Sequence, residues 1–184
     1  MSVSASELLH LAKQAASAGA DVLARRSVEA LGAQNKSSGS DWVTAFDLAA
    51  ERAVRDVIAH SRPHDVITGE ELGTTVPDRD SGTGRVRWSI DPLDGTTNFI
   101  RNIVYYCTSV AAMDANGRWL AGVVHAPALD RVYWAALGQG AWVRDRGRVT
   151  RLQAPDVGRK GKLLGTGFSY DAGARVQQVG ELGS

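Results

Sequence analysis

The spacing of apolar residues changes near Pro63, and this change divides the chain into a helical part and a strand-rich part. Before it, apolar residues recur every three or four positions over about 5–30 and again over about 48–58, which predicts two amphipathic helices. Ser4 and Glu7 form a capping-box pattern where the first helix should begin, and Pro63 closes the second. We therefore expect the chain to open with a helical hairpin.

After Pro63 the pattern is that of strands. A short apolar run ends at Gly69, a Gly/Asp/Thr-rich stretch over 73–85 predicts a loop, and apolar residues alternate with polar ones from Val86 to Ile90. Further strands are expected near 106–113, 119–125, 131–136, 141–144 and 162–166, with hairpin turns at 116–117 and 145–147. Helices followed by a mostly antiparallel sheet place the chain in the α+β class.

Charge and composition exclude several classes of function. The 184 residues carry a formal net charge of +1, so no strong positive field recruits nucleic acid. Cys107 has no second cysteine to pair with, and no stretch approaches the 18 apolar residues of a membrane span. We expect a cytoplasmic protein without a membrane or nucleic-acid partner, in which 1–184 is a single domain.

Three acidic residues stand at the ends of predicted strands. Glu70 follows the first strand, Asp91 follows the second, and Asp94 comes three residues later across a stiffening proline. Carboxylates at strand ends can converge, and Mg²⁺ prefers one or two of them together with water and substrate phosphate. The carbonyl of Leu93 could join this shell, so the pattern predicts a magnesium site.

Directly after these residues, Gly95-Thr96-Thr97-Asn98 has the composition of a phosphate site. A glycine permits close approach, and the free N–H groups of a starting helical turn attract an anion. A predicted metal site and a predicted phosphate site are thus contiguous in the sequence.

Each of these residues also has a purely structural interpretation. Asp94 could cap a helix, and Glu70 with Glu71 could be a solvated loop pair. Asp47 fits a capping box with Thr44. It is the combination of the motifs that favours a functional site.

Together the motifs resemble those of the inositol monophosphatase family of Mg²⁺-dependent, lithium-sensitive phosphatases. Gly69-Glu70-Glu71 and the run from Trp88 to Phe99 are similar to its first signature, and Asp41 to Asp47 is similar to an upstream element. Weaker family patterns match at 138–141 and 165–168. The family fold is a layered α-β-α-β-α arrangement, of which the helical hairpin and the large sheet are expected here.

The resemblance also implies a role for each site residue. Mg²⁺ would be held by Glu70, Asp91, Asp94 and the Leu93 carbonyl, and substrate would contact Glu70, Leu93, Asp94, Gly95 and Thr96. Glu70 would orient the attacking water, while Thr96 and Asp47 assist its deprotonation. The expected reaction is hydrolysis of inositol monophosphate, or of a related small sugar or polyol phosphate, by metal-activated water.

Two alternatives stay open at this stage. The second family signature, Trp-Asp-x-Ala-Gly, is absent, so the domain is expected to be truncated at its C-terminus, and the chain could be a non-catalytic remnant that binds phosphate or a protein. The substrate could instead be that of the histidinol-phosphate or phosphoadenosine phosphatase branches. Family members commonly pair, so a homodimer is expected for the intact parent.

Overall fold

The computed structural model describes residues 4–25, 45–77, 86–153, 173 and 176–178. Its helical elements are α1 (Ala5–Ala24), α3 (Ala45–Ser61), α4 (Thr96–Ile100) and the 3-10 turn η1 (Pro127–Leu129). Its strands are β1 (Val66–Gly69), β2 (Thr74–Thr75), β3 (Arg87–Asp94), β4 (Cys107–Met113), β5 (Trp119–Ala126), β6 (Arg131–Ala136), β7 (Gly140–Asp145) and β8 (Arg148–Leu152). None of the described helices is both long and apolar enough to cross a membrane.

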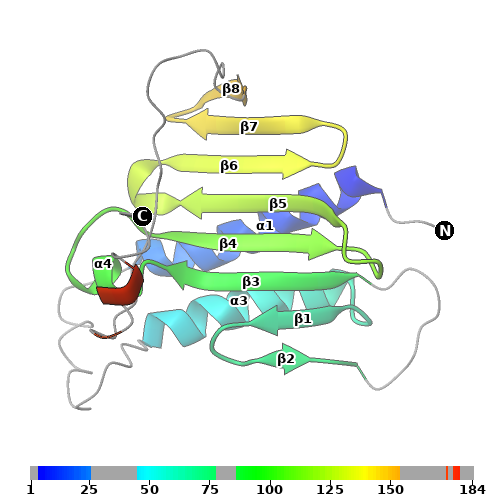
Figure 1. Ribbon diagram of the computed structural model, residues 1–184, viewed down its shortest axis with the longest axis horizontal. Helices are drawn as coiled ribbons and strands as arrows, with labels where there is room; N and C mark the ends of the chain where they lie inside the picture. Colours follow the sequence, from blue (N-terminus) through cyan, green and yellow to red (C-terminus); the bar gives the residue numbers. More distant parts are fainter. Residues whose placement is uncertain (1–3, 26–44, 78–85, 154–172, 174–175, 179–184) are drawn as a thin grey trace. The chain divides into compact units, whose positions relative to one another are not determined.

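All of these strands belong to one sheet in the order β2-β1-β3-β4-β5-β6-β7-β8 (Figure 1). Only β1 and β3 run parallel, and every other neighbouring pair is antiparallel. The predicted α+β class is confirmed. In such a parallel pair the carboxyl ends of the two strands meet at the same edge of the sheet.

The hydrophobic core lies between the sheet and the two long helices. Figure 1 shows α1 and α3 on the same face, where α1 packs on β4 and β5 and α3 packs on β3. Alternate strand residues supply the other side of this core, because successive side chains of a strand point to opposite faces. The fully buried residues include Leu8, Leu23, Val54, Ile58, Trp88 and Val110.

The helix predictions are confirmed except at one boundary. The Ser4–Glu7 capping box is present, and the second helix ends at Ser61 just before Pro63. The first helix ends at Ala24 instead of near residue 30, since the N–H of Arg25 turns back to the carbonyl of Val22. Residues 26–44, which include Thr44, lie outside the described part.

The strand predictions missed two elements. β2 lies inside the predicted loop, and its two residues are too few to show an alternating pattern. β8 follows the correctly predicted 145–147 turn, but all five of its residues are exposed, so no buried face marks it in the sequence. The strand expected near 162–166 lies outside the described residues, and the single domain over 1–184 stays a prediction.

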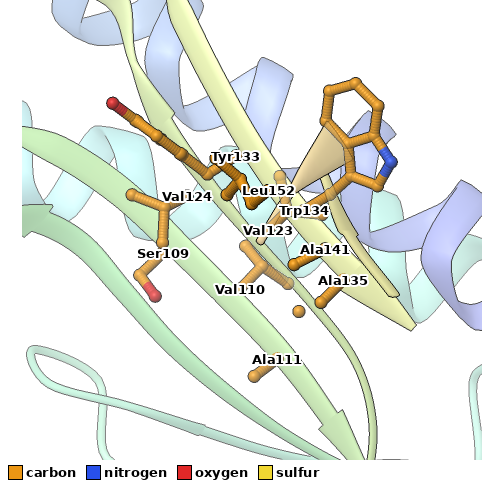
Figure 2. Close-up of a pocket in the computed structure, with 11 residues that line it drawn as sticks. Ser109, Val110, Ala111, Val123, Val124, Tyr133, Trp134, Ala135, Ala141 and Leu152 are labelled. Carbon is orange, nitrogen blue, oxygen red and sulfur yellow. The ribbon is translucent and has the colours of Figure 1, made fainter. Parts of the chain in front are cut away.

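The face of the sheet away from α1 and α3 carries a shallow apolar depression (Figure 2). It has a volume of about 360 Å³ and crosses β4 to β8. Ser109, Ala111, Gly122, Val124 and Leu152 lie among its lining residues, which include no acidic or basic side chain.

Candidate active site

The pairing of β1 with β3 brings Glu70 beside Asp91. Gly69 and Ile90 are the last register partners of this parallel pair, so Glu70, the first residue after β1, and Asp91, which is still inside β3, are the next residues of the two neighbouring strands. Glu70 raises the pKa of Asp91 both through its charge and as a hydrogen-bond partner, which indicates that the two carboxyl groups are close. The two residues thus lie close together as predicted, but the predicted strand end before Asp91 is wrong, because β3 continues to Asp94.

A bulge in β3 places Asp94 on the same face as Asp91. Residues three apart on a regular strand point to opposite faces. Here Asp91 pairs with Ser109 and Asp94 pairs with Cys107, two residues along β4, so β3 holds one extra residue between them. Because Ser109 and Cys107 share a face, Asp91 and Asp94 share it too.

Hydrogen bonds hold the bulge in shape. The buried hydroxyl of Thr108 donates to the Pro92 carbonyl at 2.9 Å, and the N–H of Leu93 donates to Asp91 at 3.2 Å. Pro92 has no N–H to offer to the ladder, so an irregular pairing costs little at this position. The hydroxyl of Thr96 donates to the Leu93 carbonyl at 3.0 Å.

The converging carboxylates repel one another. Burial, followed by the charges of Glu70 and Asp94, raises the pKa of Asp91 to about 6, and only the Leu93 N–H works in the opposite direction among the larger effects. No Lys, Arg or His of the described chain forms an ion pair with any of the three. A bound cation would relieve this repulsion.

The described side chains do not form a ready-made cage for a metal ion. No three His, Cys, Asp or Glu side chains within that part of the chain gather closely enough to enclose one. Mg²⁺ does not require such a cage, because it keeps several waters and is held by one or two carboxylates with substrate phosphate. The Glu70–Asp91 pair, with Asp94 near it, fits this requirement.

Gly95 begins α4 immediately after the carboxylates. Its φ of 95° lies in the left-handed region, and a Cβ there would approach the Tyr105 carbonyl to 2.8 Å, so only glycine fits. Gly95 is the N-cap of α4, so the interpretation of Asp94 as that cap is wrong. A pocket of about 240 Å³ adjoins these residues, and Asn98, Tyr105 and Leu129 lie on its walls.

Asp47 and Thr96 come from neighbouring elements. Asp47 is 2% exposed in the first turn of α3, and the rings of Phe46 and Phe99, 5.4 Å apart, bring that turn beside α4. The Thr96 hydroxyl has one proton, which is directed at the Leu93 carbonyl here. The pairing of Thr96 with Asp47 stays a prediction.

Cys107 lies next to Asp94 but is poorly suited to act as a nucleophile. Burial, together with the charges of Asp94 and Asp91, raises the pKa of its thiol to about 12. Its sulfur donates to Asp94 across 3.8 Å. Because the thiolate is the reactive form, a thiol with this pKa is inert near neutral pH.

Sequence reasoning missed two residues that lie beneath the site. Glu51 is fully buried in α3 and bonded to Arg55, which is 9% exposed. A Glu–Arg pair four residues apart is typical of an exposed helix face. The available signal was their position, because Glu51 follows Asp47 by four residues and shares its helix face with Val54 and Ile58.

The family relationship follows from comparison with known proteins. The model of the inositol monophosphatase family matches residues 4–182. The chain belongs to the inositol monophosphatase family. It is 42% identical over 146 residues to an inositol-1-monophosphatase of Mycobacterium bovis, covering 78% of this chain and 50% of the relative.

Two further relatives extend the comparison. A histidinol-phosphatase of Streptomyces coelicolor is 35% identical over 144 residues, which cover 76% of this chain and 51% of that protein. The solved structure of Mycobacterium tuberculosis SuhB matches with a TM-score of 0.78 and 34% identity, covering 98% of this chain and 65% of that one. The chain spans about half the length of the curated relatives.

Proposed function

We propose that this chain forms the metal- and phosphate-binding part of a Mg²⁺-dependent phosphomonoesterase. The observation that carries the proposal is the meeting of Glu70 and Asp91 at one edge of the sheet, with Asp94 turned to the same face by the bulge. Family membership supports a phosphatase, and the geometry supports a cation as its cofactor.

The proposed Mg²⁺ ligands are Glu70, Asp91, Asp94 and the carbonyl of Leu93. The chemistry that a bound Mg²⁺ would supply is a lower pKa for the attacking water and neutralisation of charge on the leaving oxygen. The bulge serves this arrangement because it directs Asp91 and Asp94 to one face.

The other proposed roles belong to residues around the carboxylates. Glu70 orients the water, and Thr96 with Asp47 accepts its proton as attack proceeds. The backbone N–H groups of Gly95 and Thr96 bind the phosphate oxygens, where the missing side chain of Gly95 allows close approach. No covalent intermediate is needed, in keeping with the protonated thiol of Cys107.

Inositol monophosphate or a related polyol phosphate is the proposed substrate. Support comes from the M. bovis relative and from the pocket beside Asp94, whose wall includes the polar side chains of Asn98 and Tyr105. Histidinol phosphate is a second candidate, because a relative that is 35% identical carries the name histidinol-phosphatase. The homodimer and the cytoplasmic location stay predictions.

Phosphate release in a Mg²⁺ titration tests the proposal. The purified protein should release phosphate from inositol monophosphate or histidinol phosphate only when Mg²⁺ is present, and chelation should abolish the release. No release from either ester at any Mg²⁺ concentration would reject the enzymatic function. Phosphate binding without turnover would instead favour the non-catalytic remnant.

A further inference from the structure

A buried carboxylate lies beneath the turn that carries Glu70. Glu51 is 0% exposed, and its two oxygens accept hydrogen bonds from the backbone N–H groups of Glu71 at 2.8 Å and Leu72 at 3.1 Å. These are the first two peptide groups after Glu70 in the chain. The turn that follows β1 is therefore fixed from below by a side chain of α3.

Arg55 extends this attachment to the far side of the turn. Its Nε donates to Glu51 at 2.7 Å, one terminal nitrogen donates to the Thr75 hydroxyl at 2.9 Å, and the other donates to the Gly73 carbonyl. The guanidinium neutralises Glu51 and also binds the start of β2. Both branches of the turn are thus held by one ion pair.

Gly69 makes the close approach of Glu51 possible. A Cβ at this position would collide with the Glu51 carboxylate, and the backbone there is not in the left-handed region. Alanine would therefore suit the local conformation while displacing the carboxylate. The glycine before Glu70 is needed for what lies below the turn and not for its backbone angles.

We propose that Glu51 is a positioning residue, which fixes the 69–73 turn so that the Glu70 carboxylate faces Asp91. This inference rests on the proposed function, in which those two carboxylates bind Mg²⁺. Two peptide groups bonded to a buried anion fix the backbone from which the exposed Glu70 side chain departs. Partners of metal ligands typically contribute about 10- to 100-fold to metal affinity.

A matched control exists at the opposite end of β1. Asp65 is 5% exposed, and like Glu51 it binds an arginine, Arg62, and accepts two N–H groups, from Val86 and from the Trp88 ring. Loss of either carboxylate should lower the melting temperature. Only loss of Glu51 should alter the metal site.

The test measures Mn²⁺ binding by electron paramagnetic resonance, with Mg²⁺ as competitor, in the purified protein. Glu51→Gln and Gly69→Ala should each weaken Mn²⁺ binding about tenfold. Asp65→Asn should bind Mn²⁺ like the unmodified protein, and Glu70→Gln should lose binding most. Excess Mg²⁺ should restore turnover in Gly69→Ala, because its ligands are displaced and not removed.

The outcomes separate the two hypotheses. Normal Mn²⁺ binding in Gly69→Ala, with weakened binding in Glu70→Gln, would overturn the role of Glu51 and leave the metal site standing. Normal binding in Glu70→Gln and Asp91→Asn would overturn the proposed function itself. If Glu51→Gln does not fold, Gly69→Ala still tests the role of Glu51, because this variant keeps both charges of the Glu51–Arg55 ion pair.

Discussion

The carboxylates at the two ends of the parallel pair β1–β3 have opposite environments. At the amino end, Asp65 is bonded to Arg62, to the Val86 N–H and to the Trp88 ring nitrogen. At the carboxyl end, Glu70 and Asp91 face each other, and no described basic side chain pairs with them. The same two strands thus carry one satisfied carboxylate and one repelling pair.

The number of hydrogen-bond donors and basic partners therefore differs between the two ends. A carboxylate with such partners stabilises the fold, whereas facing carboxylates without them are expected at a ligand-binding site. A buried anion with a full set of donors strengthens the native state, whereas anions that face one another weaken it unless a cation binds. Destabilising repulsion of this kind is typically found at functional sites, where the ligand compensates for it. The comparison predicts opposite outcomes for neutralising a carboxylate at each end.

The largest expected effect is on turnover at the carboxyl end. Asp91→Asn removes a proposed Mg²⁺ ligand while preserving shape, and Mg²⁺-dependent phosphate release should fall about 10³-fold, since metal stabilisation of the transition state is worth several kcal/mol. Steady-state release from the best substrate, at saturating Mg²⁺, measures this loss. Asp65→Asn serves as the control, and an equal loss in both variants would show that turnover only reports folding.

At the amino end, neutralising the carboxylate should lower the stability of the fold. Asp65→Asn removes the carboxylate that faces the Arg62 guanidinium and leaves one buried donor without an acceptor, which should lower the free energy of unfolding by about 3 kcal/mol. Urea unfolding followed by tryptophan fluorescence measures this change. If the variant is as stable as the parent protein, the hydrogen bonds of Asp65 contribute no more to stability than hydration of the same groups does in the unfolded chain.

The sequence predicts where the carboxylates lie, but not the bulge and the buried Glu51 that orient them. Residue types and the apolar pattern suffice to predict two strands that lead into Glu70 and Asp91, although the alternation ends at Ile90 and β3 continues to Asp94. The bulge depends on the pairing of Asp94 with Cys107, which is a tertiary property. Glu51 also escaped prediction, since its spacing from Arg55 is that of an exposed ion pair and only its place on the apolar face of α3 indicates burial.

The bulge itself can be tested through Thr108. Thr108→Val keeps the volume but leaves the buried Pro92 carbonyl without its donor, which should lower the free energy of unfolding by about 1 kcal/mol. Mg²⁺ affinity should fall severalfold, because Asp91 and Asp94 flank the loosened segment. Thr68→Val, which loses only an exposed hydroxyl contact, is the control and should change stability by less than about 0.5 kcal/mol.

The smallest expected effect is the pH dependence of the metal-free protein. Burial and the neighbouring carboxylates raise the pKa of Asp91 to about 6, so the folded state binds this proton more tightly than the unfolded chain does. Deprotonation of Asp91 should therefore remove stability as pH rises from about 4 to about 6. Because the group is half-buried and partly screened, the loss should be about 1 kcal/mol.

Asp91→Asn isolates this contribution from all other titrating groups. In chelator, the variant should match the parent protein near pH 4 and exceed its free energy of unfolding by about 1 kcal/mol near pH 7. Urea unfolding of both proteins across this range measures the difference. A difference that stays constant with pH would mean that neither burial nor the neighbouring carboxylates raise the pKa of Asp91, and the contrast between the two ends of β1–β3 would then reduce to hydrogen bonding alone. A difference that grows with pH and vanishes on adding Mg²⁺ would support the proposal that a cation binds at this edge and offsets its instability.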